Sequence, residues 1–207
     1  MPEPGSAIFV VDDDASVRDA ISNLLESVGL RGETFRSADE FLRASRPEAP
    51  SCLILDVKLP GRNGLEIQEE LESIGIRIPI VFITAHGDIP MTSRAMKAGA
   101  VDFLAKPFQK KDLLDAVHQA LERDRIQRKE RAEISKLRAR LDTLTPRERD
   151  VMDLVVTGLT NKEAAAKLSV SEITVKVHRG RAMQKMEADS LAELVIMSEK
   201  LKHRPRR

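Results

Sequence analysis

The chain has 207 residues, enough for one large domain or two of ordinary size. Hydrophobic residues make up 42% of it, which suffices for buried cores, although it has no Trp, no Tyr and a single cysteine, Cys52. One cysteine excludes a disulfide framework and a cysteine-based zinc cluster. No apolar run reaches the roughly 18 residues of a membrane span, and residues 1–5 lack the features of a signal peptide. We therefore expect a soluble cytoplasmic protein that does not contact a membrane.

The net charge of +1 conceals an asymmetry along the chain. Residues 1–121 carry 13 Lys and Arg against 19 Asp and Glu, whereas residues 122–207 carry 21 against 14. An acidic part followed by a basic part indicates two domains with different partners, and the basic domain is suited to nucleic acid.

Short apolar runs alternate with amphipathic segments over the first 121 residues. The apolar runs, typical of buried strands, lie at 7–11, 31–35, 52–55, 78–84 and 101–105. The segments between and after them predict helices at 17–28, 37–46, 63–73, 91–98 and from residue 110 onward. Five strands alternating with five helices predict an α/β fold with a doubly wound, five-stranded parallel sheet.

Polar side chains follow four of these strands: Asp12 and Asp13, Asp56, Thr84 and Lys106. The carboxyl ends of parallel strands meet at one edge of a sheet, where ligands bind. Three carboxylates gathered there repel one another, which raised pKa values or a divalent cation would relieve, and hard oxygen ligands suit Mg²⁺. A lysine and a hydroxyl beside them complete a site equipped for phosphoryl transfer to a carboxylate.

Each of these residues also has an ordinary structural explanation when it is taken alone. Asp13 or Asp14 is explained as the N-cap of the next helix, Lys106-Pro107 as a turn and Thr84 as a strand end. The occurrence of the whole set at four strand ends, in this order, favours the functional interpretation.

Residues 122–141 are predicted to form a helical linker, because they contain no Gly or Pro and more than half of them are charged. An apolar seam with 3-4-3 spacing begins in this segment and consists of Ile134, Leu137, Leu141 and Leu144. We favour a solvated helical linker. A short dimeric coiled coil is the alternative, although coiled coils usually need three or four heptads.

Residues 142–207 predict an all-α domain of four helices. Thr145-Pro146-Arg147-Glu148 combines an N-cap, a proline at the first helical position and a capping glutamate, and Thr160 with Glu163 repeats the capping box. A tight turn at 169–171 leads into a third helix over 172–186, and a fourth begins after Ser190.

A helix, a tight turn and a basic helix are typical of a helix-turn-helix, whose second helix enters the DNA major groove. On that helix we expect Val175 to point inward and the basic side chains to lie on or near the outer faces, where they suit phosphate and base contacts: Lys176, His178, Arg179 and Arg181. The alternative is a solvated basic face on a helical interaction domain.

Residues 6–121 resemble the receiver domain of two-component response regulators in four motifs: Val11-Asp12-Asp13-Asp14, Leu55-Asp56-Val57-Lys58-Leu59-Pro60-Gly61, Ile83-Thr84-Ala85 and Lys106-Pro107-Phe108. Gly87-Asp88-Ile89-Pro90-Met91 resembles the FixJ branch of these regulators. The resemblance implies that Asp56 accepts a phosphoryl group from a histidine of a partner kinase.

The same resemblance assigns roles to the other residues of this pocket. Asp12, Asp13 and Asp56, with the backbone carbonyl of Lys58, would hold Mg²⁺. Lys106 would pair with the phosphate, and the Lys106–Pro107 bond would be cis. Thr84 and Phe103 match the switch pair, in which the hydroxyl moves toward the phosphate and the ring turns inward.

Residues 142–203 resemble the LuxR-type helix-turn-helix. The matching motifs are Leu144-Thr145-Pro146-Arg147-Glu148-Arg149-Asp150-Val151, Leu159-Thr160-Asn161-Lys162-Glu163-Ala164-Ala165 and Thr174-Val175-Lys176-Val177-His178-Arg179. The resemblance implies that the last helix mediates dimerisation and that the DNA-binding residues are Thr160, Asn161, Thr174, Lys176, Val177, His178, Arg179 and Arg181. Two departures affect base reading: Gly180 lies inside the recognition helix, and Glu187-Ala188-Asp189 places acid near its end.

Together these resemblances predict a FixJ/NarL-type response regulator with a receiver (1–121), a helical linker (122–141) and a DNA-binding domain (142–207). Phosphorylation of Asp56 by a histidine kinase would promote homodimerisation and binding to double-stranded DNA, and so regulate, and more specifically activate, transcription. We expect that the protein is not an enzyme. The rival interpretation is a phosphohydrolase that uses Asp56 as its nucleophile. Such an enzyme needs a general acid two residues after the nucleophile, where this chain has Lys58. A receiver that only docks partners without phosphate is a third possibility.

Overall fold

The computed structural model describes residues 5–85 and 89–202, so residues 87 and 88 of the FixJ-like motif lie outside the described residues. The chain divides into two compact units, Met1–Arg128 and Lys129–Arg207, which we call the N-terminal and the C-terminal unit. Each is described by itself. None of the helices in the described part is long and apolar enough to cross a membrane.

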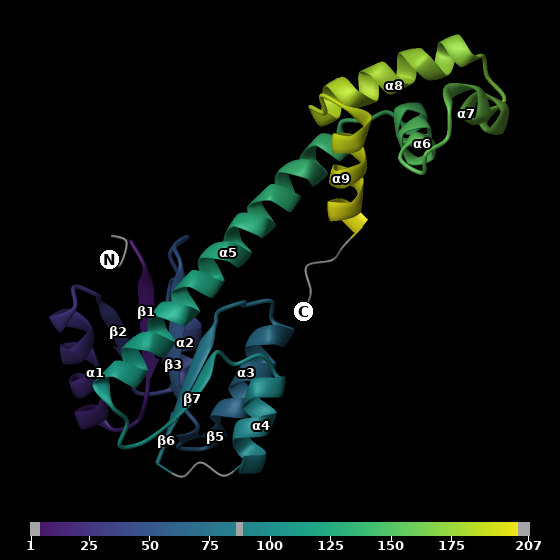
Figure 1. Cartoon of the computed structure of the whole chain (residues 1–207). Coiled ribbons are helices and arrows are strands. Elements are labelled where there is room, and N and C mark those ends of the chain that lie inside the picture. Colours follow the sequence, from purple (N-terminus) through teal and green to yellow (C-terminus); the bar gives the residue numbers. More distant parts are fainter. Residues whose placement is uncertain (1–4, 86–88, 203–207) are drawn as a thin grey trace. The chain divides into compact units, whose positions relative to one another are not determined.

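The N-terminal unit is built on a five-stranded parallel sheet with the order β2-β1-β3-β6-β7 (Figure 1). The predicted doubly wound α/β fold is therefore confirmed. Its strands are β1 (Ala7–Val11), β2 (Gly32–Phe35), β3 (Ser51–Asp56), β6 (Ile80–Thr84) and β7 (Asp102–Ala105). Its helices are α1 (Ala15–Ser27), α2 (Ala38–Arg43), α3 (Gly64–Ser73), α4 (Ile89–Lys97) and the first part of α5 (Lys110–Asp142).

Both faces of the sheet are covered, as the unbroken apolar runs of the strands require. Phe9 and Leu53 point to the face covered by α2, α3 and α4, where they join a core that includes Phe41. Ile8 and Ile54 point to the opposite face, which α1 and α5 cover (Figure 1). Alternate residues of one strand thus belong to different cores, and the strand ends are held at a common edge.

Two local features differ from the sequence-based expectations. A small antiparallel hairpin of β4 (Lys58–Leu59) and β5 (Arg62–Asn63) follows β3. Helix α2 ends at Arg43, three residues earlier than predicted. Its cap is only half of a capping box: Ser37 accepts a hydrogen bond from the Glu40 amide, but the Glu40 carboxylate accepts from the Arg36 amide. The hydrogen bond between the Glu40 carboxylate and the Arg36 amide, four residues away, therefore takes the place of the bond to the Ser37 amide that a complete capping box has.

Cys52 is fully buried on β3, and burial together with the nearby Asp124 carboxylate raises the pKa of its thiol. The thiol is therefore held protonated and behaves as a small apolar side chain of the core.

The C-terminal unit is all helical, as predicted. The last part of α5 is followed by α6 (Pro146–Val155), α7 (Asn161–Leu168), α8 (Glu172–Met186) and α9 (Leu191–Lys202). Thr145 and Thr160 each complete a capping box, with Glu148 and Glu163 respectively. These helix starts lie within one residue of where the capping residues predict them.

The apolar seam at the end of α5 is largely covered inside the C-terminal unit. Leu144 belongs to the core of the unit, Leu141 packs against that core, and Leu137 is only 4% exposed. Ion pairs from Glu133 to Lys200 and from Arg140 to Glu187 connect the same stretch to the rest of the unit. This part of α5 therefore packs as a helix of the C-terminal unit instead of standing as a solvated linker or a free coiled-coil seam.

Candidate functional site

The first strand delivers three carboxylates to the carboxyl edge of the sheet, each with a different environment. Asp12 is fully buried, and its carboxylate accepts a hydrogen bond from the Asp14 amide at 2.9 Å. Asp13 is exposed. Asp14 caps α1 by accepting from the Ser16 amide at 2.8 Å, which is the ordinary role that the sequence allowed for it.

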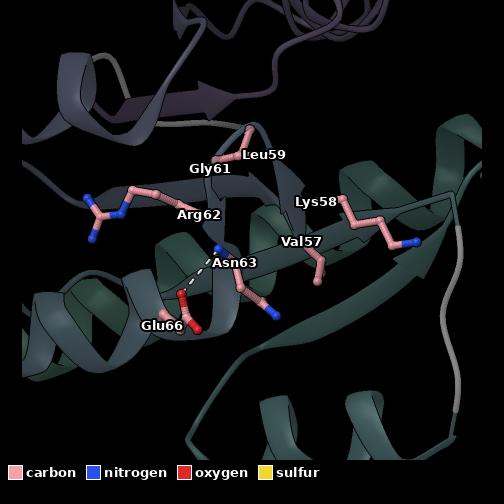
Figure 2. A pocket seen from close by; sticks show the side chains of 7 residues that line it. All are labelled: Val57, Lys58, Leu59, Gly61, Arg62, Asn63 and Glu66. Carbon is pink, nitrogen blue, oxygen red and sulfur yellow. Dashed lines mark hydrogen bonds between the residues drawn. The ribbon is translucent and has the colours of Figure 1, made fainter.

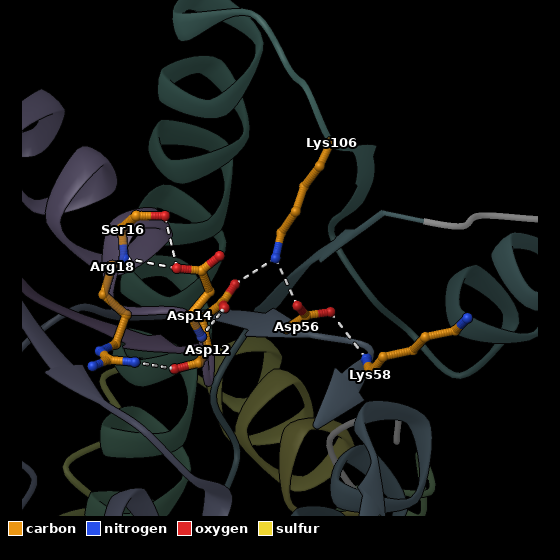
Figure 3. Close-up of polar contacts among 7 residues, drawn as sticks. All are labelled: Asp12, Asp14, Ser16, Arg18, Asp56, Lys58 and Lys106. Carbon is orange, nitrogen blue, oxygen red and sulfur yellow. Dashed lines mark hydrogen bonds and ion pairs between the residues drawn. The ribbon is translucent and has the colours of Figure 1, made fainter. Parts of the chain in front are cut away.

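Asp56 ends β3, two strand positions beyond Ile54, and is only 6% exposed. Its Oδ1 accepts a hydrogen bond from the Lys58 backbone amide at 2.9 Å (Figure 3). The chain turns at Lys58 into the β4–β5 hairpin, while the Lys58 side chain is exposed. Asp56 is thereby fixed at one oxygen by the backbone that follows it.

Lys106 follows β7 and crosses the edge of the sheet to reach both acids (Figure 3). Its Nζ lies 2.6 Å from Asp12 Oδ2 and 2.6 Å from Asp56 Oδ2. The Lys106–Pro107 peptide bond is cis. Three side chains predicted to meet, from β1, β3 and the end of β7, are therefore brought together by direct ion pairs.

The buried charges in this pocket alter one another's pKa values. Burial raises the pKa of Asp12, and the hydrogen bond from Lys106 only partly opposes this effect. For Lys106, burial acts to lower the pKa, but the carboxylates of Asp12 and Asp56 outweigh burial and raise it. Lys106 is accordingly held as an ammonium ion.

Asp12, Asp13 and Asp56 form a cluster that could hold a metal ion, because one oxygen from each lies within 4.8 Å of the others. Such all-oxygen sets suit Mg²⁺, which binds through one or two carboxylates plus water and phosphate oxygens. One acid of the cluster is exposed and two are buried, so the cluster opens to solvent on the Asp13 side.

The two residues of the predicted switch lie on neighbouring strands. Thr84 is fully buried at the end of β6, and its carbonyl accepts a hydrogen bond from the Lys106 amide at 2.6 Å. The half-buried Phe103 ring on β7 lies 6.1 Å from the Phe82 ring. Thr84 is therefore tied through the backbone to Lys106, whereas Phe103 contacts the core through an aromatic neighbour.

A shallow pocket of about 440 Å³ lies beside the β4–β5 hairpin (Figure 2). It is lined by Val57, Lys58, Leu59, Gly61, Arg62, Asn63 and Glu66, and none of the three clustered acids lines it. The acidic cluster, and not this pocket, is therefore the candidate site.

Arg18 is a residue of the site that the sequence analysis missed. Arg18 is the fourth residue of α1, and its guanidinium donates to the Asp12 backbone carbonyl at 2.7 Å (Figure 3). The sequence did contain a signal for this contact. Arg18 lies one turn after Asp14, the N-cap of α1, so its side chain can reach back to the end of β1. Arg18 positions the loop that presents the acids.

In the C-terminal unit, α7 and α8 are joined by the tight turn expected of a helix-turn-helix. Ser169 ends α7 in the left-handed conformation, with φ 54° and ψ 46°, and Ser171 caps α8. Val175 is buried, as predicted. Lys176 and Arg181 are exposed on α8, which leaves them accessible to a ligand.

Several predicted DNA contacts are engaged within the protein. Arg179 is half-buried and donates to Asn161 Oδ1 at 3.2 Å. The Thr160 hydroxyl donates to the Glu163 carboxylate in the capping box of α7. Thr174 shares a hydroxyl contact of 2.8 Å with Ser171. His178 is half-buried, and among the described residues its Nδ1 has no hydrogen-bond partner. Val177 is exposed.

Fold and site together define a two-part regulator: an α/β domain with an acidic pocket, and a helix-turn-helix unit. Residues 8–118 match the response regulator receiver domain, and residues 142–198 match the luxR family of bacterial regulatory proteins. The chain belongs to the response regulators with a LuxR-type DNA-binding domain and is a transcription regulator. The predicted family is thereby confirmed.

Its relatives match nearly the whole chain. Nodulation protein W of Bradyrhizobium diazoefficiens is 56% identical over 194 residues, which are 94% of this chain and 86% of that protein. The transcriptional regulatory protein FixJ of Azorhizobium caulinodans is 41% identical and covers 96% of this chain and 93% of its own length. The solved structure of the response regulator StyR is 51% identical, with a TM-score of 0.82, covering 95% of this chain and 99% of that one.

Proposed function

We propose that Asp56 accepts a phosphoryl group from a phosphohistidine of a partner histidine kinase. One observation carries this proposal: Asp56 is a nearly buried carboxylate whose Oδ2 lies 2.6 Å from an ammonium and whose Oδ1 is held by a backbone amide. In this setting the carboxylate is fixed in position, and the Lys106 ammonium beside it can stabilise the negative charge of the phosphoryl group.

Asp12, Asp13 and Asp56, with the Lys58 carbonyl, would hold Mg²⁺. The residues fit the ion, because one oxygen from each of the three acids lies within 4.8 Å of the others and Mg²⁺ prefers oxygen ligands. When bound, Mg²⁺ supplies positive charge that offsets the repulsion between these carboxylates and the phosphoryl oxygens.

In the transfer itself, a bond forms between an Asp56 carboxylate oxygen and phosphorus while the histidine P–N bond breaks and its electron pair returns to the imidazole. Lys106 donates hydrogen bonds to the phosphoryl oxygens. The Thr84 hydroxyl, at the adjacent strand end, turns toward the new phosphate, and the Phe103 ring moves inward. The face formed by α4, β7 and α5 changes in consequence.

We further propose that phosphorylation promotes homodimerisation and binding of α8 to double-stranded DNA in the cytoplasm, and that the result is activation of transcription. The exposed Lys176 and Arg181 support the DNA contact. The family match supports the role in transcription, and the name of the FixJ relative is that of a transcriptional regulatory protein.

Two rival functions are less well supported. A phosphohydrolase with Asp56 as nucleophile needs a general acid two residues later, where this chain has the exposed cation Lys58. A receiver that docks partners without phosphate has no use for the ion-paired acids Asp12 and Asp56. We therefore propose a regulator that is not an enzyme.

The test is phosphorylation by acetyl phosphate with and without Mg²⁺, followed by intact mass and size-exclusion light scattering. We expect a Mg²⁺-dependent adduct on the wild type and not on Asp56→Asn, together with a shift toward the dimer. Asp19→Asn, which replaces an exposed carboxylate of α1, is the matched control and should behave as the wild type. Absence of the adduct from the wild type would overturn the proposal.

A further inference from the structure

One side of α8 carries an exposed stripe that the helix-turn-helix fold alone does not explain. Ile173, Lys176, Val177 and Gly180 follow the i, i+3, i+4, i+7 spacing of a single helix face. All four are exposed, and the Ile173 side chain is 77% exposed. Val177 is 46% exposed. Two branched apolar side chains one turn apart therefore face solvent.

This stripe lies opposite the packed side of the helix. Val175, Ala182 and Met186 are buried and belong to the core of the C-terminal unit. At 100° per residue, the mean direction of these three buried residues lies about 150° from the mean direction of the four stripe residues. Ile173 and Val177 are therefore not edge residues of the core, and the core does not need them.

The surroundings of the stripe indicate what covers it. Lys176 lies within the stripe and the exposed Arg181 beside it, so the apolar pair is flanked by cations that match phosphates. At Gly180 an added Cβ would meet nothing within 4 Å, so the stripe is open where a side chain would otherwise stand. Glu172 is exposed on the flank of the stripe, outside its i, i+3, i+4 spacing.

Duplex DNA is an occupant that combines phosphates with a specific apolar group. In the major groove, thymine alone among the four bases presents a methyl group, and apolar side chains such as those of Ala, Thr and Phe contact it. The first residues of a recognition helix are those that lie nearest the base edges. Ile173 is the second residue of α8, and Val177 follows one turn later.

We infer that Ile173 is a specificity-determining residue that contacts a thymine methyl group in the major groove, with Val177 extending the contact along the groove. This inference rests on the proposed binding of α8 to DNA and adds to it the base that is read. The operator of this protein contains thymine opposite Ile173, and the missing side chain at Gly180 allows the backbone of α8 to approach the groove.

The test begins with the full chain treated with acetyl phosphate and Mg²⁺, which selects duplexes from a random-sequence library. Each thymine of the selected duplex is then replaced singly by deoxyuridine, which removes only the methyl group. For the wild type, we expect the dissociation constant to rise about threefold to tenfold at one or two positions. Ile173→Ala should bind the selected duplex more weakly and lose the sensitivity at its own position.

Ile74→Ala is the matched control, because Ile74 is also exposed but lies in the N-terminal unit. It should keep the full deoxyuridine effect. Circular dichroism should give the same helix content for all variants, since the truncated side chains are exposed. A duplex that is enriched but equally sensitive to deoxyuridine with wild type and Ile173→Ala overturns the inference alone. Failure to enrich any duplex overturns the proposed DNA binding as well, and the inference with it.

Discussion

The Asp124 carboxylate on α5 accepts a hydrogen bond at 2.9 Å from the backbone amide of Ser51, the first residue of β3. Asp124 is fully buried, and the same carboxylate oxygen pairs with the Arg128 guanidinium at 2.6 Å. This contact joins β3, the strand that ends at Asp56, to α5, one of the two helices that cover the same face of the sheet.

Replacing Asp124 by Ala should destabilise the N-terminal unit by about 2 kcal/mol, because the Ser51 amide loses its partner in a buried place. Urea unfolding followed by circular dichroism measures the loss, and hydrogen exchange at the Ser51 amide should accelerate. Asp115→Asn changes an exposed acid of the same helix and should stay within roughly 0.5 kcal/mol of the wild type. Equal effects of the two substitutions would contradict this role for Asp124.

Loss of one clustered acid should weaken the binding of Mg²⁺ without abolishing it. For Asp13→Asn we expect the Mg²⁺ concentration that gives half-maximal adduct from acetyl phosphate to rise at least about tenfold, since the loss of groups that only orient a metal ligand already weakens metal binding about 10- to 100-fold. Asp13 is exposed, so the fold should be kept. Excess EDTA should abolish the adduct in every variant.

Asp14→Asn is the matched control for the metal titration. Asp14 is the next exposed acid along the chain, but it caps α1, and Asn caps a helix as well as Asp does. Its Mg²⁺ titration should coincide with that of the wild type. A shift as large as that of Asp13→Asn would mean that general surface charge, not ligation, sets the metal dependence.

The stability of the C-terminal unit should depend on the charge of Glu148. The Lys185 ammonium, 2.7 Å away, and the Thr145 amide lower the pKa of Glu148 to about 2 from 4.5. A carboxyl with a lowered folded-state pKa contributes stability above its unfolded pKa and loses it as the pH falls through the folded one. The contribution is thus complete above about pH 5.5 and declines between about pH 5 and pH 2.

Glu148→Gln should therefore lower the urea midpoint at pH 7, and the gap to the wild type should narrow as the pH approaches 3. Asp153→Asn changes an exposed acid on the same helix, and the difference between its urea midpoint and that of the wild type should stay the same across that pH range. A difference between wild type and Glu148→Gln that does not vary with pH would show that packing, and not charge, makes Glu148 important.

Two serines that flank the turn of the helix-turn-helix should respond in opposite directions. Ser169 has a left-handed backbone that glycine adopts without steric cost, so Ser169→Gly should stabilise the unit by roughly 0.5 kcal/mol. Ser171 accepts from the Thr174 amide as the N-cap of α8, so Ser171→Ala should cost about 1 kcal/mol. Thermal unfolding measures the change in stability of each variant. Changes of the same sign would contradict either the left-handed conformation of Ser169 or the capping role of Ser171.

Much of the fold follows from the sequence because its signals are local. Apolar runs that end on polar residues predict the five strands, and Thr145 and Thr160 mark two helix starts. The convergence of Asp12, Asp56 and Lys106 could also be foreseen, because the ends of parallel strands share an edge. Their roles in phosphorylation stay predictions.

Other features depend on contacts between distant parts of the chain and have no local signal. The hairpin of β4 and β5 is too short to show a strand period. The bond from Ser51 to Asp124 joins residues 73 positions apart. The inward turn of Arg179 toward Asn161 likewise depends on how α7 packs against α8. Of the four side chains expected on or near the outer faces of α8, Lys176 and Arg181 are exposed, whereas His178 and Arg179 are half-buried.

The burial of Cys52 has a practical consequence for following this protein in solution. Since its only thiol is enclosed and kept protonated, an introduced cysteine such as Asp19→Cys becomes the one site that reacts with a maleimide dye. The absence of Trp and Tyr also leaves the chain with little absorption near 280 nm and without Trp or Tyr fluorescence. Fluorescent reporters can thus be placed on either unit one at a time, without first removing a native residue.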